Sequence, residues 1–378
     1  MITRIEELIS EYSVRNKKSE DIPVYSVTND RGFCTGYFSK EVASKDKSTY
    51  KIVPRGYFAY NPSRINVGSV DWQNCEDRVI VSPLYVVFSI SEQLDQQYFL
   101  HYLKSDIMLN YIKEYATGSV RDNLKLSDLG KLSVNLRPLD EQRRIAAVLD
   151  KVSDLIAKRR QQLEKLDLLV KARFVEMFGD PVDNPKQWET KGLAELGECK
   201  NGMNFHTEDS GIDIHCLGVG DFKDLSYITD TSMLPMISLD KMPSNEYLLQ
   251  NGDIVFVRSN GNKDLVGRSI AVFPDQIPTT FSGFCIRFRL KSSIVQTDYL
   301  LRTLKTDSVR KKMGGRGANI QNLNQKILSD LQIPIPPLDL QNQFSAFVEQ
   351  IEKTKISIKE SLENMETLKK ALMQEYFG

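Results

Sequence analysis

The sequence predicts an α+β protein in which two mixed α/β domains are separated by two long antiparallel helices that form a coiled coil, with a pseudo-two-fold internal repeat. Three observations predict this fold. The chain has 378 residues, which is enough for two domains of ordinary size. A segment near its middle recurs at its end, and each copy has the apolar period of a long helix. Strand-like and turn-like segments fill the remainder.

The repeat is a gap-free match of residues 118–179 with residues 317–378. Its clearest part is RPLDEQRR (137–144) beside PPLDLQNQ (336–343), where Gln142 meets Gln341. A weaker match extends upstream, from YFLHYLKSD to YLLRTLKTD. The chain is therefore two copies of one unit, each a variable globular part followed by a shared tail.

Each tail predicts one long helix, at residues 138–179 and 337–378. Asp140 and Asp339 suit a helix start, and no proline or glycine interrupts either helix before its terminal Phe-Gly. Apolar residues then recur by fours and threes, which is the pattern of a coiled-coil stripe. The predicted helix-pairing seam consists of Ile145, Leu149, Val152, Ile156, Leu163, Leu166 and Val170 in the first helix, and Phe344, Val348, Ile351, Ile358, Leu362, Met365 and Leu372 in the second.

The two helices are predicted to pair with each other in antiparallel fashion. Residues 138–179 carry a net charge of +2 and residues 337–378 a net charge of −2, which favours pairing weakly. Each helix is about 60 Å long. An antiparallel pair keeps each globular part near one end of the helices, whereas a parallel pair requires the chain to return the full length. The alternative leaves each helix on its own globular core.

The globular parts, residues 1–137 and 180–336, are predicted to be mixed α/β and rich in strands. Gly56 and Gly252 each mark a turn into a strand. Residues 180–191 form a proline-containing linker that leads into the second part. The predicted strands are 52–61, 78–90, 248–260 and 279–290, and the predicted amphipathic helices are 96–115 and 297–313.

Composition and charge bear on whether the chain is a nucleic-acid-binding, membrane or secreted protein. The net charge is zero, so composition alone gives no support for nucleic-acid binding. No segment has the roughly 20 apolar residues that span a bilayer, and the polar start MITRIEELIS is unlike a secretory signal. The five cysteines are scattered without a CxxC pair, as expected for reduced thiols. These features predict a cytoplasmic protein without a membrane partner.

Metal and catalytic motifs are incomplete. His206, His215 and Cys216 lack the paired spacing of a zinc site, so no metal is expected. NPSR (61–64) resembles the Asn-Pro-Pro-aromatic motif of adenine methyltransferases but lacks the second proline and the ring. GNKDLVGRS (261–269) has the wrong glycine spacing for a phosphate loop. We therefore expect no catalytic residues.

Asp180 and Glu189-Thr190-Lys191 resemble the acidic pattern of nucleases. They stand in the predicted linker without a strand context, so we interpret them as linker residues. The remaining function to consider is binding of a ligand through polar side chains.

Polar side chains follow an equivalent strand in each half. Arginine and asparagine make bidentate contacts with guanine and adenine edges. These loops are therefore candidate DNA readers, meaning loops that recognise bases by hydrogen bonds to their edges. A basic stretch, 302–322, is an additional candidate for phosphate contact. The candidates are Asn61, Arg64 and Asn66 in the first half, and Arg258, Asn260, Asn262, Lys263, Lys305, Lys311, Lys312 and Arg316 in the second.

The duplicated tails, PLDEQRRIAAVLDKVSDLIAKRRQQLEKLDLLVKARFVEMFGDP (138–181) and PLDLQNQFSAFVEQIEKTKISIKESLENMETLKKALMQEYFG (337–378), resemble the specificity subunit of Type I restriction–modification systems. The resemblance covers essentially the whole chain. It implies two target-recognition domains that read a bipartite, asymmetric site in double-stranded DNA, with the helices fixing their separation.

The same resemblance implies partners that carry the chemistry. Two methyltransferase (modification) subunits supply S-adenosylmethionine chemistry, and restriction/translocase subunits use ATP and Mg. No cofactor is expected in this chain, which catalyses nothing. The alternatives are a coiled-coil adaptor whose globular parts bind proteins, and a self-contained DNA methyltransferase or endonuclease.

Overall fold

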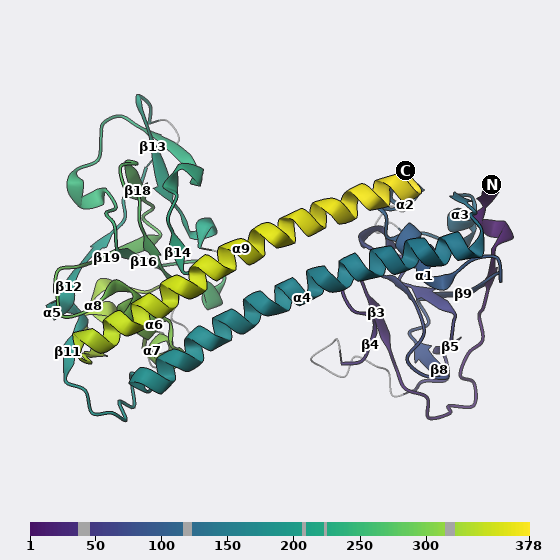
Figure 1. Cartoon of the computed structure of the whole chain (residues 1–378), viewed down its shortest axis with the longest axis horizontal. Coiled ribbons are helices and arrows are strands. Elements are labelled where there is room, and N and C mark those ends of the chain that lie inside the picture. Colours follow the sequence, from purple (N-terminus) through teal and green to yellow (C-terminus); the bar gives the residue numbers. More distant parts are fainter. Residues whose placement is uncertain (37–45, 116–122, 206–208, 223–224, 314–321) are drawn as a thin grey trace. The chain divides into compact units, whose positions relative to one another are not determined.

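The computed structural model describes residues 1–36, 46–115, 123–205, 209–222, 225–313 and 322–378 (Figure 1). The chain divides into two compact units: the first comprises Met1–Gln161 and Ile358–Gly378, and the second comprises Gln162–Ser357. Each unit therefore contains one globular part and about half of each long helix. Among the described helices, none combines the length and apolar character needed to cross a bilayer.

The first unit is built on an antiparallel sheet in the order β2-β9-β6-β7. All three residues of the central strand β6 are buried. The sheet strands are β2 (Ile9–Glu11), β9 (Val86–Ile90), β6 (Phe58–Tyr60) and β7 (Val70–Trp72). The smaller pairs are β1 (Ile2–Arg4) with β10 (Ser133–Asn135), β3 (Ser26–Thr28) with β4 (Gly32–Cys34), and β5 (Lys51–Pro54) with β8 (Arg78–Val81). The short helices are α1 (Gln96–Leu103), α2 (Asp106–Tyr115) and α3 (Leu126–Gly130).

The second unit has a larger sheet in the order β12-β19-β16-β17-β14, in which only the β14–β17 pair is parallel. Its strands are β12 (Gly197–Asn201), β19 (Cys285–Leu290), β16 (Asp253–Val257), β17 (Ser269–Val272) and β14 (Tyr227–Ile228). A second sheet comprises β15 (Met236–Leu239), β13 (Ile212–Leu217) and β18 (Thr279–Phe281), and β11 (Thr190–Gly192) pairs with β20 (Gln332–Pro334). The short helices are α5 (Leu193–Leu196), α6 (Thr297–Lys305), α7 (Asp307–Met313) and α8 (Gln325–Ser329).

The two units repeat one topology. The strand order β12-β19-β16-β17 in the second unit matches β2-β9-β6-β7 in the first, with every neighbouring pair antiparallel. Helices α6, α7 and α8 then follow the sheet as α1, α2 and α3 do, and β20 follows as β10 does. The first unit has no three-stranded sheet among its described strands that matches β13–β15–β18, although Val24 forms a parallel bridge to Ile80 of β8. The structure thus confirms the predicted internal repeat.

Several predicted elements are interrupted. The predicted strand 78–90 is two strands, β8 and β9, separated around Pro83, which has no amide hydrogen to donate to a sheet. Each predicted amphipathic helix is also two helices, with breaks near Ser105 and Thr306. The hydroxyls of these residues accept hydrogen bonds from the amides of Met108 and Val309, at 3.2 and 3.4 Å, and so cap the second helix of each pair.

A buried glutamine fixes the start of each long helix, α4 (Leu139–Phe178) and α9 (Leu338–Phe377). Gln142 is fully buried; its amide oxygen accepts from the Asp95 amide at 2.8 Å, and its nitrogen donates to the carbonyls of Gln93 and Arg137 at 2.9 and 2.7 Å. Gln341 makes the same three contacts in the second unit, to the main chain of Gln296, Ile294 and Pro336. The two helix starts are therefore anchored alike.

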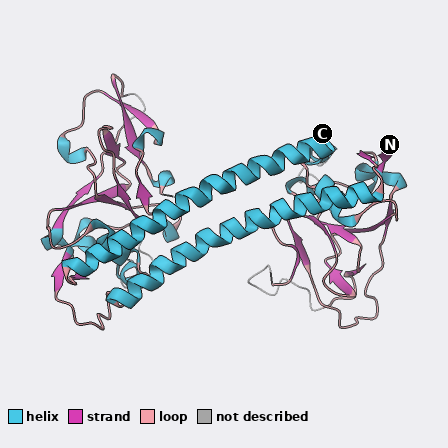
Figure 2. Cartoon of the chain, in the orientation of Figure 1, coloured by secondary structure: helices cyan, strands magenta, loops and turns pink. Residues whose placement is uncertain are grey.

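Within each unit the helix segments run antiparallel. In the first unit Arg137, just before α4, donates to the carbonyl of Tyr376 near the end of α9 at 3.2 Å. Further along, Arg160 pairs with Glu366 at 2.6 Å. In the second unit Lys355 pairs with Asp167 at 2.6 Å. Figure 2 shows both helices as uninterrupted, with the strands confined to the globular parts, which confirms the predicted fold class.

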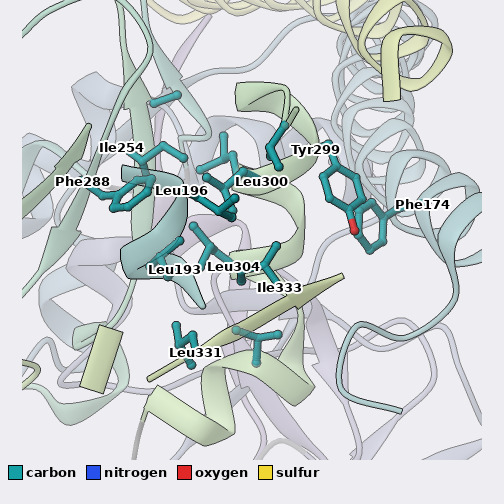
Figure 3. Close-up of a cluster of buried hydrophobic side chains, with 14 of the residues drawn as sticks. Phe174, Leu193, Leu196, Ile254, Phe288, Tyr299, Leu300, Leu304, Leu331 and Ile333 are labelled. Atoms are coloured by element: carbon teal, nitrogen blue, oxygen red, sulfur yellow. The ribbon is translucent and has the colours of Figure 1, made fainter. Parts of the chain in front are cut away.

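Every position of the predicted seam is buried or half-buried. The ends of the seam nevertheless pack into the globular cores: Ile145 and Leu149 belong to the core of the first unit. Val170 and Phe344 belong to that of the second, where the Phe174 ring also stacks on Tyr299 at 5.7 Å (Figure 3). The prediction that each helix packs chiefly on the other is thus incomplete, because the apolar stripe serves both neighbours.

Candidate nucleic-acid interface

In the first unit, the loop that follows β6 lines a cavity of about 640 Å³. Asn61 and Arg64 contribute to its wall, together with Asn29, Tyr85 and Asn123 from other segments. These side chains offer amide, guanidinium and phenol groups, which hydrogen-bond to base edges and to phosphates. The cavity therefore combines concave shape with the polar groups of a reader.

The residues of this loop have different local roles. The side-chain oxygen of Asn61 accepts from the Ser63 amide and hydroxyl, at 3.1 and 3.0 Å, and so shapes the turn. Arg64 precedes a 3₁₀ turn, η2 (Ile65–Val67), and its side chain is exposed. Asn66 lies within η2 and is half-buried. Arg64 is thus the one of the three predicted residues that is most accessible to a ligand.

In the second unit, the loop that follows β16 is stabilised by its own asparagines. The Asn260 side-chain oxygen accepts from the Asn262 amide at 2.7 Å, and that of Asn262 accepts from the Asp264 amide at 3.0 Å. Arg258 is half-buried, and its guanidinium donates to the Gly283 carbonyl at 3.4 Å. Lys263 starts the 3₁₀ turn η6 (Lys263–Leu265), and its side chain lies outside the described part.

The two loops occupy equivalent positions in the shared topology. Each follows a sheet strand that pairs on both sides, β6 or β16, and each is tied to the segment before α3 or α8. The Leu124 amide donates to the Pro62 carbonyl at 3.1 Å, and the Leu323 amide donates to the Arg258 carbonyl at 2.7 Å. The neighbouring Asn123 and Asn322 are not among the site residues predicted from the sequence, although the recurrence of Asn-Leu in both copies is a signal for them.

The basic stretch of the second unit divides into two groups. Lys311 and Lys312 are exposed on α7 and face solvent, as a phosphate contact requires. Lys305 instead reaches into a cavity, where its ammonium donates to the Leu225 carbonyl and the Ser226 hydroxyl, both at 3.0 Å. Arg316 lies outside the described residues.

The described histidines and cysteines do not gather into a metal site. Within the described ranges no group of three His, Cys, Asp or Glu side chains has the geometry to hold a metal ion. His215 hydrogen-bonds through Nδ1 to the Leu234 carbonyl at 2.9 Å, and His206 lies outside the described residues. Burial raises the pKa of Cys216 and of Cys285 to about 12, so both thiols stay protonated at neutral pH.

Comparison with known proteins gives matches in both halves of the chain. The family model of the Type I restriction modification DNA specificity domain matches residues 6–166 and residues 185–366. The StySPI specificity subunit of Salmonella potsdam, a Type I restriction enzyme subunit, is 26% identical over 300 residues, which are 74% of this chain and 64% of that protein. The MjaVIII specificity subunit of Methanocaldococcus jannaschii is 23% identical over 299 residues, covering 74% of this chain and 69% of that protein.

Solved structures share the fold. A chain from a study of complex assembly and conformational transition of the type I R-M system has a TM-score of 0.60 at 17% identity, covering 100% of this chain and 97% of that chain. The S subunit of the Type-I restriction-modification system from M. genitalium has a TM-score of 0.58 at 14% identity, covering 100% and 96%. Because the family model matches each half, and each half has the same sheet, loop and helix start, this chain belongs to the family of Type I restriction modification DNA specificity domains.

Proposed function

We propose that the chain is the DNA sequence-specificity subunit of a Type I restriction–modification complex. Each globular part reads one short block of a bipartite, asymmetric site in double-stranded DNA, and the bases between the blocks are unread. The observation that supports this most directly is the pair of loops after β6 and β16. They hold equivalent positions but differ in sequence, as two readers of two different blocks require.

In this proposal, other subunits of the complex carry out the catalytic reactions. Two methyltransferase subunits bind S-adenosylmethionine and modify adenine, and restriction/translocase subunits use ATP and Mg. This chain holds no cofactor, catalyses nothing and works in the cytoplasm without a membrane partner. The named relatives are themselves specificity subunits. The near-zero net charge fits a reader whose partners supply much of the phosphate contact.

The proposal is tested by co-expressing the chain with the modification subunit encoded beside it and mapping N6-methyladenine across the host genome. The expected result is one split motif: two short defined blocks around a gap of fixed length. The absence of methylation from a soluble complex with an active partner would instead support the protein-binding adaptor. Methylation by the purified chain alone would support a self-contained methyltransferase.

A further inference from the structure

A cationic cavity of about 470 Å³ lies in the second unit, among α4, α6, α7 and β17. Five basic and two acidic side chains are among its described lining residues. The basic residues are Lys171, Arg268, Arg302, Lys305 and Arg310, and the acidic residues are Asp180 and Asp307. The cavity is thus strongly positive in a chain whose total charge is zero.

Neutral oxygens, rather than carboxylates, hold the innermost cations. Lys305 donates to the Leu225 carbonyl and the Ser226 hydroxyl, and Arg310 donates to the carbonyls of Asp264 and Val266 at 3.1 and 3.3 Å. Arg302 is 8% exposed, and the carboxylates of Asp167, Glu352 and Asp298 attract it. A buried cation is costly unless an opposite charge compensates it.

Several nearby acids are engaged by other groups, although Asp264 and Asp307 attract Arg310. Asp180 accepts from the amides of Val182 and Asp183 at 2.8 and 3.2 Å. Asp167 and Glu352 attract Arg302 from a distance, but both are paired with Lys355, at 2.6 and 2.7 Å. The residues that line the cavity nevertheless include more basic than acidic side chains.

The pKa of Lys305 responds to burial and to the neighbouring positive charges. Burial, and next the Arg302 guanidinium, lower the pKa of Lys305 to about 7; Lys355 and Arg310 act in the same direction, and Asp167 opposes them. A bound anion would favour the ammonium form, so Lys305 would take up a proton when the anion binds.

We propose that this cavity binds the phosphate group of a small organic phosphate of nucleotide size. Arg302, Lys305 and Arg310 supply the charged donors that a phosphate requires. Phe222 and Ile270, from the same lining, supply an apolar wall for the remainder of the ligand. The volume lies within the usual range of small-molecule sites. The cavity borders the loop after β16, because Arg310 donates to the carbonyls of Asp264 and Val266. Its test measures binding of a small ligand without DNA.

The test is calorimetric titration of the full-length chain with inorganic phosphate and with adenosine monophosphate, at constant ionic strength. We expect one saturable site, with adenosine monophosphate binding more tightly than phosphate. Lys305→Gln should weaken binding about tenfold or more, because a charge-assisted hydrogen bond is lost. Lys171→Gln, an exposed change at the rim, should weaken it about threefold. The matched control is Lys326→Gln, which removes an exposed lysine on α8 and should leave binding unchanged.

A pH comparison separates Lys305 from the ligand's own titration. Binding at about pH 8 should be accompanied by proton uptake, measured from the dependence of the heat on buffer ionisation, and Lys305→Gln should abolish it. Equal affinities in Lys305→Gln, Lys171→Gln and Lys326→Gln, or no saturable binding, would overturn the site. Displacement of adenosine monophosphate by an unrelated duplex would assign the cavity to DNA backbone and overturn the small-ligand assignment.

Discussion

At the scale of single residues, Gln142 and Gln341 perform the same task in the two units. Each is fully buried and joins three main-chain groups from the helix start and from the segment before the first short helix. Removing the side chain takes a hydrogen-bond partner from three main-chain groups, most of them part-buried, and such a loss is costly. Their recurrence in the repeat follows from this anchoring and needs no role in recognition.

We predict that Gln142→Ala and Gln341→Ala each lower the free energy of unfolding by about 3 kcal/mol. Urea denaturation measures the change. Gln161→Ala, at an exposed position of α4, is the control and should stay within about 0.5 kcal/mol of wild type. A Gln142→Ala variant as stable as the control would show that the buried hydrogen bonds contribute nothing net.

The two loop arginines give a second prediction at this scale. Arg64→Ala should relax or abolish recognition of one half-site only, and Arg258→Ala should do so for the other, because the two lie in separate units. The measurement is the methylation motif of the co-expressed complex. Arg55→Ala, at the exposed turn before β6, is the control and should leave both blocks intact. Loss of both blocks from either loop variant would contradict independent readers.

The positions of some candidate residues follow from the local sequence, whereas those of others depend on contacts that are distant in the chain. The sequence predicts equivalent loops for Arg64 and Arg258, because each follows a strand marked by a glycine turn. In the structure Gly56 and Gly252 both have φ of +86°. From the sequence, Lys305 is only one of several basic residues on a predicted amphipathic helix. Its position in a cavity depends on Leu225 and Ser226, which are about 80 residues away in the chain. Such long-range partners are not encoded in local spacing.

At the scale of elements, the long helices were the most predictable part. No proline or glycine interrupts them, and their stripe repeats over 40 residues, so helix start and end agree closely with expectation. The short helices were predicted as single elements because their apolar period continues across the break. In the structure, the hydroxyls of Ser105 and Thr306 cap the second helix of each pair at the break.

The apolar stripe predicts how substitutions on α4 differ by face. Leu149 is fully buried in the first core, so Leu149→Ala should lower the free energy of unfolding by about 3 kcal/mol through the cavity that it leaves. The neighbouring Val148 is 41% exposed, and Val148→Ala should cost less than about 1 kcal/mol. Thermal or urea unfolding compares the two. Similar losses would contradict the assigned face of the helix.

At the scale of the whole molecule, the elements that recur in both units differ in role from the elements that do not. The sheet order, the anchoring glutamine and the antiparallel helix segments recur in both units. The loops after β6 and β16 differ, as does the additional β13–β15–β18 sheet. Common elements that hold a variable surface are what a modular reader requires, since the surface can change without a change of frame.

This division predicts the outcome of exchanging one globular part. Replacing residues 182–316 by the corresponding part of another family member should change one block of the methylated motif and leave the other block unchanged. The gap should also stay constant, because both long helices lie outside the exchanged residues and are retained. Genome-wide mapping of N6-methyladenine in cells that express the exchanged chain with the same modification subunit measures all three features at once. A change in both blocks would mean that the two units read DNA jointly, and the loops after β6 and β16 would then not be separate readers.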